Sequence, residues 1–166
     1  MNRLIFTIFL LLVVKLSIGQ ERVYNSDKTF SIIPIEEWIN YSKGNEIVFF
    51  HKLTSFRDIY QESIQIKTYP ADSITLDELW NSFIMSDLTK SFKNYKSKQT
   101  GKSNINGKNA NWTEFTNTAY GHKLFNLVYM LVENNIIYHI VCISLEKDYK
   151  SVENDFKKMI NSLKIE

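Results

Sequence analysis

Two long apolar runs, Leu124–Val132 and Ile137–Leu145, constrain the fold of this 166-residue chain more than any other feature. Both runs are rich in Val, Ile, Leu, Tyr and Phe, a composition that suits a pleated sheet. Only Glu133–Ile136 separates them, and its central Asn134-Asn135 pair tolerates positive φ. The sequence therefore predicts two neighbouring antiparallel strands joined by a type I′ turn.

The tight turn also fixes how the two strands face each other. The predicted register pairs Leu127 with Cys142, Val128 with Val141, Met130 with His139, and Val132 with Ile137. Both faces of this hairpin are mostly apolar, whereas a strand with one solvated face alternates between apolar and polar residues. We therefore expect other elements to cover both faces.

The C-terminal segment Asp148–Leu163 has the pattern of an amphipathic helix that supplies part of this cover. Its apolar residues recur at helical spacing and form one stripe: Val152, Phe156, Met159, Ile160 and Leu163. Asp148 or Ser151 is the predicted N-cap.

The first nineteen residues have the features of a secretory signal peptide. Arg3 gives a positive start, the apolar run Leu4–Val14 follows, and the small residues Ser17 and Gly19 precede a cut before Gln20. The run is about eleven residues long, too short for a bilayer span of about twenty. We expect export, to the periplasm or beyond the cell, of a single domain over residues 20–166 without a transmembrane segment.

The mature chain is balanced in charge. Without Arg3 and Lys15 it keeps 18 basic and 18 acidic residues, which argues against nucleic acid or an anionic membrane as a general partner. Cys142 is the only cysteine, so an internal disulfide is excluded, and its position within an apolar strand predicts a small buried side chain.

Shorter patterns predict the remaining elements. Strands are expected at Thr29–Pro34, Glu46–Leu53 and Gln61–Tyr69, a helical turn at Ile35–Asn40, a loop at Tyr41–Asn45, and a connection tucked under the sheet at Thr54–Tyr60. Asn106-Gly107 predicts a second hairpin, Asn94–Ile105 with Lys108–Ala119, near an edge of the sheet.

Thr75 opens the best-marked helix, because Thr75 to Glu78 is a capping box. Its apolar stripe is Leu76, Leu79, Trp80, Phe83, Ile84, Leu88 and Phe92, which we interpret as core.

Catalytic and metal-binding patterns are missing from the sequence. His51, His122 and His139 do not follow a metal-ligand spacing, and neither a nucleophile elbow nor a glycine-rich phosphate loop occurs. We therefore predict no catalytic, cofactor-binding or metal-binding residue. The segment Lys90–Lys108 contains six lysines and no acid, which we interpret as a solvated edge, with an anionic partner as the alternative. Asn40 and Asn111 match the glycosylation acceptor pattern.

Three short motifs resemble the PsbP/Mog1-like proteins. They are the opening Thr29–Pro34 followed by Trp38, the hairpin Ile105–Ala110 followed by Trp112, and the closing Phe156–Leu163. The resemblance implies an α+β fold, an antiparallel sheet with helices packed on both faces as an α/β/α sandwich. It also implies a binding or assembly role, because the family consists mostly of such factors.

These observations favour an exported binding module without enzymatic activity or cofactor, whose partner is a protein or another component of the cell envelope. The sequence leaves its oligomeric state open. Two alternatives stay open: a hydrolase-type enzyme with a site that only the fold assembles, for example His122 near a carboxylate, and a carrier of a small apolar ligand in a cavity behind Trp80 and Phe83.

Overall fold

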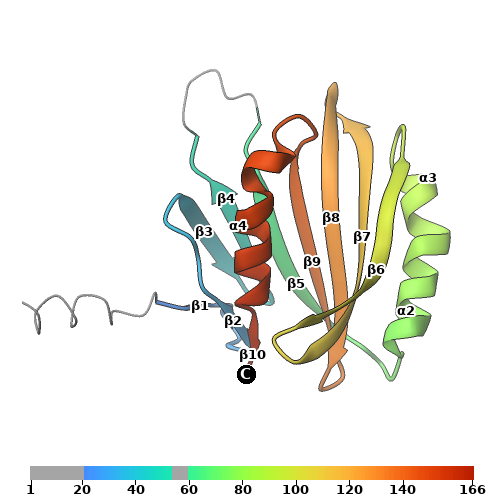
Figure 1. Ribbon diagram of the computed structural model, residues 1–166. Helices are drawn as coiled ribbons and strands as arrows, with labels where there is room; N and C mark the ends of the chain where they lie inside the picture. Colours follow the sequence, from blue (N-terminus) through green and yellow to red (C-terminus); the bar gives the residue numbers. More distant parts are fainter. Residues whose placement is uncertain (1–20, 54–59) are drawn as a thin grey trace, which may run out of the picture.

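The structure, a computed structural model, describes residues 21–53 and 60–166, without the side chains of residues 85–87 and 89. The predicted signal peptide and the connection 54–59 lie outside the described residues. The described chain forms an α+β fold dominated by one antiparallel sheet, with helices at residues 76–91 and 149–161 (Figure 1).

Seven strands make up this sheet, in the order β3-β4-β5-β9-β8-β7-β6. Their bounds are β3 Trp38–Lys43, β4 Glu46–His51, β5 Ser63–Pro70, β6 Lys96–Ile105, β7 Lys108–Ala119, β8 His122–Glu133 and β9 Ile136–Leu145. The hairpin predicted at the centre is confirmed, because β9 is the middle strand and β8 its neighbour. Met130 faces His139, and Asn134 and Asn135 have φ of 52° and 59°, as a type I′ turn requires.

A small second sheet joins the two ends of the described chain. It contains β1 (Val23–Tyr24), β2 (Phe30–Ile32) and β10 (Lys164–Ile165), with β2 in the middle. Arg22 links this small sheet to the end of the C-terminal helix. Its guanidinium donates to Ser31 Oγ at 2.9 Å and to the Ser162 carbonyl at 2.5 Å. The C-terminal helix is thereby tied to the start of the domain.

The core is divided into two clusters by the sheet. Leu127 and Val128 are neighbours on β8 and point to opposite sides, so they belong to different clusters. The Leu127 cluster contains buried side chains of α4 (Tyr149–Asn161), among them Val152, Phe156, Met159 and Ile160. The Val128 cluster contains Leu88 and Phe115, with Phe83, Ile84 and Phe92 packed against it.

The predicted stripe of α4 is confirmed, since all of its members are buried, but its cap differs from the prediction. Asp148 is the N-cap residue and makes no side-chain capping bond; instead Ser151 Oγ donates to the Asp148 carbonyl at 2.6 Å. The αR backbone at Asp148, with φ of −100° and ψ of −7°, differs from the extended conformation that places a capping side chain over the first turn.

The capping box at Thr75 is confirmed. Thr75 Oγ1 accepts from the Glu78 backbone N–H at 3.3 Å, and Glu78 Oε2 accepts from the Thr75 N–H at 2.9 Å. The helix that follows is not uniform: α2 (Leu76–Ser82) continues as the π-helical η1 (Phe83–Leu88) and the short α3 (Thr89–Ser91). Phe92 is already extended, although the apolar spacing alone predicts helix to that point.

The prediction for residues 35–45 is wrong. In place of a helical turn and a loop, Trp38–Lys43 forms β3, which pairs with β4 through a turn where Gly44 has φ of +56°. Pairing of Trp38 with His51 places the indole against the α4 ring of Phe156, 5.7 Å between centroids. Burial of this ring outweighs the weak local helical preference. At the other end of the hairpin, Leu53 lies outside β4 and is exposed.

Candidate functional site

The three histidines lie apart in the fold. His51 is the last residue of β4. Its Nδ1 lies 3.8 Å from Glu62 Oε2, and its ring centroid lies 5.3 Å from that of Trp38. His122 begins β8, and none of the ion pairs formed within the described residues includes it. His139 lies within β9, edge-on to Phe83, and burial lowers its pKa. The structure therefore does not bring a histidine and a carboxylate together at His122, as the hydrolase alternative requires.

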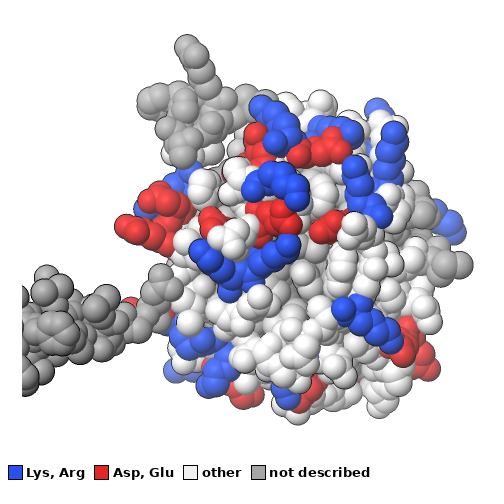
Figure 2. Space-filling model, in the orientation of Figure 1, with Lys and Arg blue, Asp and Glu red and all other residues white. Residues whose placement is uncertain are grey.

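Acids from distant parts of the chain lie beside the lysine-rich segment. The Nζ of Lys98 lies 3.6 Å from Glu146 Oε1, and the Nζ of Lys102 lies 3.3 Å from Asp77 Oδ1. Lys108 forms an ion pair with Glu133. On the face drawn in Figure 2, charges of both signs are interspersed and do not form a continuous basic field. The local excess of lysine in the sequence is therefore offset in three dimensions.

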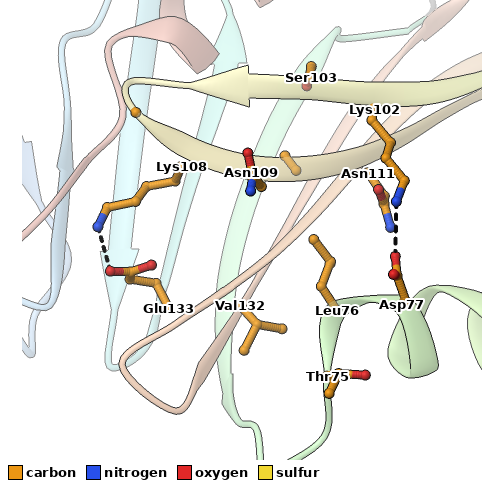
Figure 3. A pocket seen from close by; sticks show the side chains of 12 residues that line it. Thr75, Leu76, Asp77, Lys102, Ser103, Lys108, Asn109, Asn111, Val132 and Glu133 are labelled. Atoms are coloured by element: carbon orange, nitrogen blue, oxygen red, sulfur yellow. Dashed lines mark hydrogen bonds and ion pairs between the residues drawn. The ribbon is translucent and has the colours of Figure 1, made fainter.

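A cleft opens where the β6–β7 hairpin diverges from β8; we call it the interstrand cleft. The β7–β8 ladder ends at Asn111 opposite Met130, whereas β7 continues to pair with β6 as far as Lys108. The start of α2 closes the remaining side. The cleft has a volume of about 590 Å³, and its walls include Leu76, Asp77, Lys102, Ser103, Lys108, Asn111, Val132 and Glu133 (Figure 3).

Two ion pairs stand at the ends of the interstrand cleft. Lys102 pairs with Asp77 of α2 at one end, and Lys108 pairs with Glu133 of β8 at the other (Figure 3). The charges of these four side chains therefore cancel in pairs. The Lys102–Asp77 pair is solvent-exposed, and such pairs contribute only about 0–1 kcal/mol to stability.

Asn111 is the most unusual residue of the interstrand cleft. It is only 2% exposed, and its side-chain Nδ2 has no hydrogen-bond partner. The buried hydroxyl of Ser103, which borders the same cleft, is also without a partner. A buried polar group left unpaired costs about 1–3 kcal/mol, so two of them at one cleft call for a specific explanation.

A second cleft adjoins the first; we call it the Trp80 cleft. Its volume is about 380 Å³, and it shares Asp77, Lys102 and Asn111 with the interstrand cleft. Trp80, Asn81, Thr100 and Gly101 complete its walls. Trp80 therefore borders a polar cleft, which differs from the apolar cavity that the small-ligand alternative predicts. Lys102 and Asp77 line both clefts, and their ion pair lies beside Asn111 (Figure 3).

A third cleft, of about 370 Å³, lies between α4 and strands β6 to β8. Trp112, Tyr129 and Tyr149 line it, and Tyr149 Oη donates to Glu114 at 3.3 Å. Burial, with the neighbouring Cys142 and Glu114, raises the pKa of Tyr129 to about 12. Glu153 is bound by Lys150 and Lys157. The acids of this cleft have partners, so it lacks the unsatisfied groups that mark the interstrand cleft.

Sequence reasoning singled out Asn111 only as a glycosylation acceptor, and its burial closes it to that modification in the folded state. Alternation along β7 places Asn111 on the same side as Thr113 and Phe115, and both of these are buried. An asparagine that alternates with buried residues along a strand is the sequence signal that predicts a buried amide. Whether that amide finds a hydrogen-bond partner depends on β8 and α2, which are separate elements of the chain.

Comparison with protein families and with curated proteins gives no match. Three solved structures are similar in fold. PsbP (CyanoP) from Synechocystis sp. PCC 6803 is 14% identical, covers 90% of this chain and 96% of its own, and has a TM-score of 0.60. The Ran-binding protein Mog1p of Saccharomyces cerevisiae is 13% identical, with coverages of 90% and 96% and a TM-score of 0.59. LpqN of Mycobacterium tuberculosis, involved in cell envelope biogenesis, is 8% identical, with coverages of 87% and 89% and a TM-score of 0.62.

This protein therefore has a PsbP/Mog1-like fold, as the three sequence motifs predict. At identities of 8–14%, this similarity defines the fold only and does not extend to the ligands that these proteins bind. Within residues 21–53 and 60–166, no helix has the length and apolarity needed to cross a membrane. The same residues hold no group of three or more His, Cys, Asp or Glu side chains arranged for a metal ion.

Proposed function

We propose that this protein is an exported, non-enzymatic binding module of the cell envelope, and that the interstrand cleft is its binding site. The N-terminal nineteen residues support export by their signal-peptide pattern. The remaining chain is then one α/β/α sandwich, with α4 on one face of the sheet and the α2–α3 segment on the other. The two separate core clusters support this arrangement.

The buried, partnerless amide of Asn111 carries the proposal. An unsatisfied donor beside a polar cleft favours binding, because a ligand can supply the missing acceptor. The groups around it do not favour catalysis. The carboxylates of Asp77 and Glu133 are each paired with a lysine, and the walls of the cleft include neither a histidine nor a cysteine.

Two of the similar structures are compatible with such a role. LpqN is involved in cell envelope biogenesis, and Mog1p binds Ran. We infer for this chain a partner that is a protein or another envelope component, met outside the cytoplasm.

Position-specific photocrosslinking in the native host tests the proposal. A benzophenone amino acid is placed at Asn109, which is exposed and borders the interstrand cleft, and in a control variant at Tyr41, which is exposed on the edge strand β3. We expect a crosslinked envelope component from the Asn109 position and not from the Tyr41 position. N-terminal sequencing of the exported protein is expected to begin at Gln20.

Two results would refute the proposal. Finding the protein in the cytoplasm with residues 1–19 still attached would exclude export. Equal capture at Asn109 and Tyr41, or capture at neither, would exclude the interstrand cleft as the binding site.

A further inference from the structure

We propose that the interstrand cleft and the Trp80 cleft together bind a neutral, polyhydroxylated ligand, a saccharide unit of one or two rings, with Asn111 as its central hydrogen-bonding residue. This inference rests on the proposed binding function and names the ligand class for the same site.

The unsatisfied groups indicate where the ligand is held. Five buried side-chain polar atoms within the described residues have no hydrogen-bond partner, and two of them, Asn111 Nδ2 and Ser103 Oγ, belong to walls of the interstrand cleft. The amide Nδ2 can only donate, whereas a serine hydroxyl can donate and accept. Strand pairing places Asn111 on the face of Lys102 and Ser103 on the face of Ala110, so the two groups lie on opposite sides of the β6–β7 ladder. The amide of Asn111 is therefore the group that a sugar hydroxyl meets from the α2 side.

The charges of the walls indicate a neutral ligand. Lys102 and Asp77 neutralise each other, as do Lys108 and Glu133. An anionic or a cationic ligand would have to break one of these pairs and leave a charge of its own sign nearby. A neutral ligand can accept from the lysines and donate to the carboxylates, and it leaves both pairs free to form again once it is bound.

Trp80 supplies the apolar surface that a sugar ring needs. It is half-buried in the Trp80 cleft, and Asn81 and Thr100 are close to it with further polar groups. The C–H face of a pyranose packs well on an indole ring, while its equatorial hydroxyls reach side-chain amides and hydroxyls. The volumes of the two clefts, about 590 and 380 Å³, lie within the range typical of small-ligand sites.

The Lys102–Asp77 pair acts as a weak strap between the two clefts. Lys102 lies directly opposite Asn111 on the neighbouring strand, and Asp77 reaches it from α2 (Figure 3). Both side chains are more than 70% exposed, so water competes for them and the pair opens at little cost. Opening would give a ligand access to the amide of Asn111.

Binding is tested with the mature protein and a panel of neutral mono- and disaccharides, by saturation-transfer NMR and by calorimetry. The expected result is binding of at least one saccharide, with a shift of the Asn111 side-chain amide signal. Asn111→Leu keeps the branched shape of the side chain, replaces both polar atoms by methyl groups, and should weaken binding by about tenfold or more because it removes the donor. The same substitution should leave the stability of the free protein equal or higher, because no hydrogen bond is lost there.

Two further variants separate the ligand site from general effects on the fold. Trp80→Ala should also weaken binding, whereas Asn40→Ala, an exposed asparagine on β3, should leave it unchanged. Asp77→Asn should not abolish binding, since it only loosens the strap.

The outcomes distinguish this inference from the proposed function. If no saccharide binds while crosslinking at Asn109 still captures a component, the ligand class is wrong and the binding module stands. A captured component that proteases digest would point to a peptide instead. If Asn111→Leu binds saccharide as well as the unaltered protein, the assignment of Asn111 is overturned.

Discussion

Gly101 on the edge strand β6 lies directly opposite Trp112 on β7, and the indole of Trp112 lies over it. A Cβ atom added to Gly101 would be 2.9 Å from two ring atoms of Trp112, closer than real Cβ contacts allow. The absence of a side chain at Gly101 is thus what allows this tryptophan to lie flat across the neighbouring strand and pack near Tyr129.

Gly101→Ala should therefore destabilise the protein, although alanine is usually the better strand residue. Overpacking typically costs about 1–3 kcal/mol, and the lower chain entropy of alanine returns about 0.4–1 kcal/mol. We expect a net loss of about 1–2 kcal/mol in the free energy of unfolding, measured by urea denaturation. In a Trp112→Val background the same substitution should be neutral or stabilising. An equal loss in both backgrounds would show that the indole is not the cause.

The pH dependence of stability should contain a contribution from His139. Burial lowers the pKa of this side chain below its ordinary value of 6.5. The unfolded state therefore binds more protons than the folded state once the pH falls through about 6.5, and stability decreases until the folded pKa is reached. The groups facing His139 are Met130 on β8, Lys67 on β5 and the ring of Phe83.

We expect the free energy of unfolding to fall between pH 7.5 and 5.5, and His139→Leu to reduce this decrease. The window lies above the range of Glu146 and Glu153, whose pKa values are lowered by their lysine partners, so these carboxylates stay ionised throughout. A His139→Leu protein with an unchanged slope in urea denaturation would assign the pH dependence to other groups.

The thiol of Cys142 should be unreactive in the folded protein. It is fully buried in β9 beside the α4 side of the core, and this burial raises its pKa, so the reactive thiolate is disfavoured. Labelling with an aromatic disulfide reagent should be roughly a thousandfold slower in buffer than in 6 M urea, because only the unfolded fraction reacts. Rapid labelling in buffer would mean that the strand opens locally without global unfolding.

Local patterns were sufficient where neighbouring residues determine the structure. Asn134-Asn135 fixes the turn and with it every pair of the β8–β9 ladder, so the pairing of Met130 with His139 was predictable. The stripe of α4 and the capping box at Thr75 depend likewise on residues within one or two turns. Trp38–Lys43 is the counterexample, because its strand exists through pairing with β4 and the burial of Trp38 against α4.

The sequence by itself therefore determined the central hairpin, the two helices and the PsbP/Mog1-like pattern, since periodicity and turn chemistry act over short distances along the chain. Tertiary structure alone decided the partners of the lysines and the candidate site. Asp77, Lys102 and Asn111 come from three separate elements. Whether the amide of Asn111 finds a partner depends on where β7 separates from β8 and where α2 begins, and this is a matter of packing among distant segments.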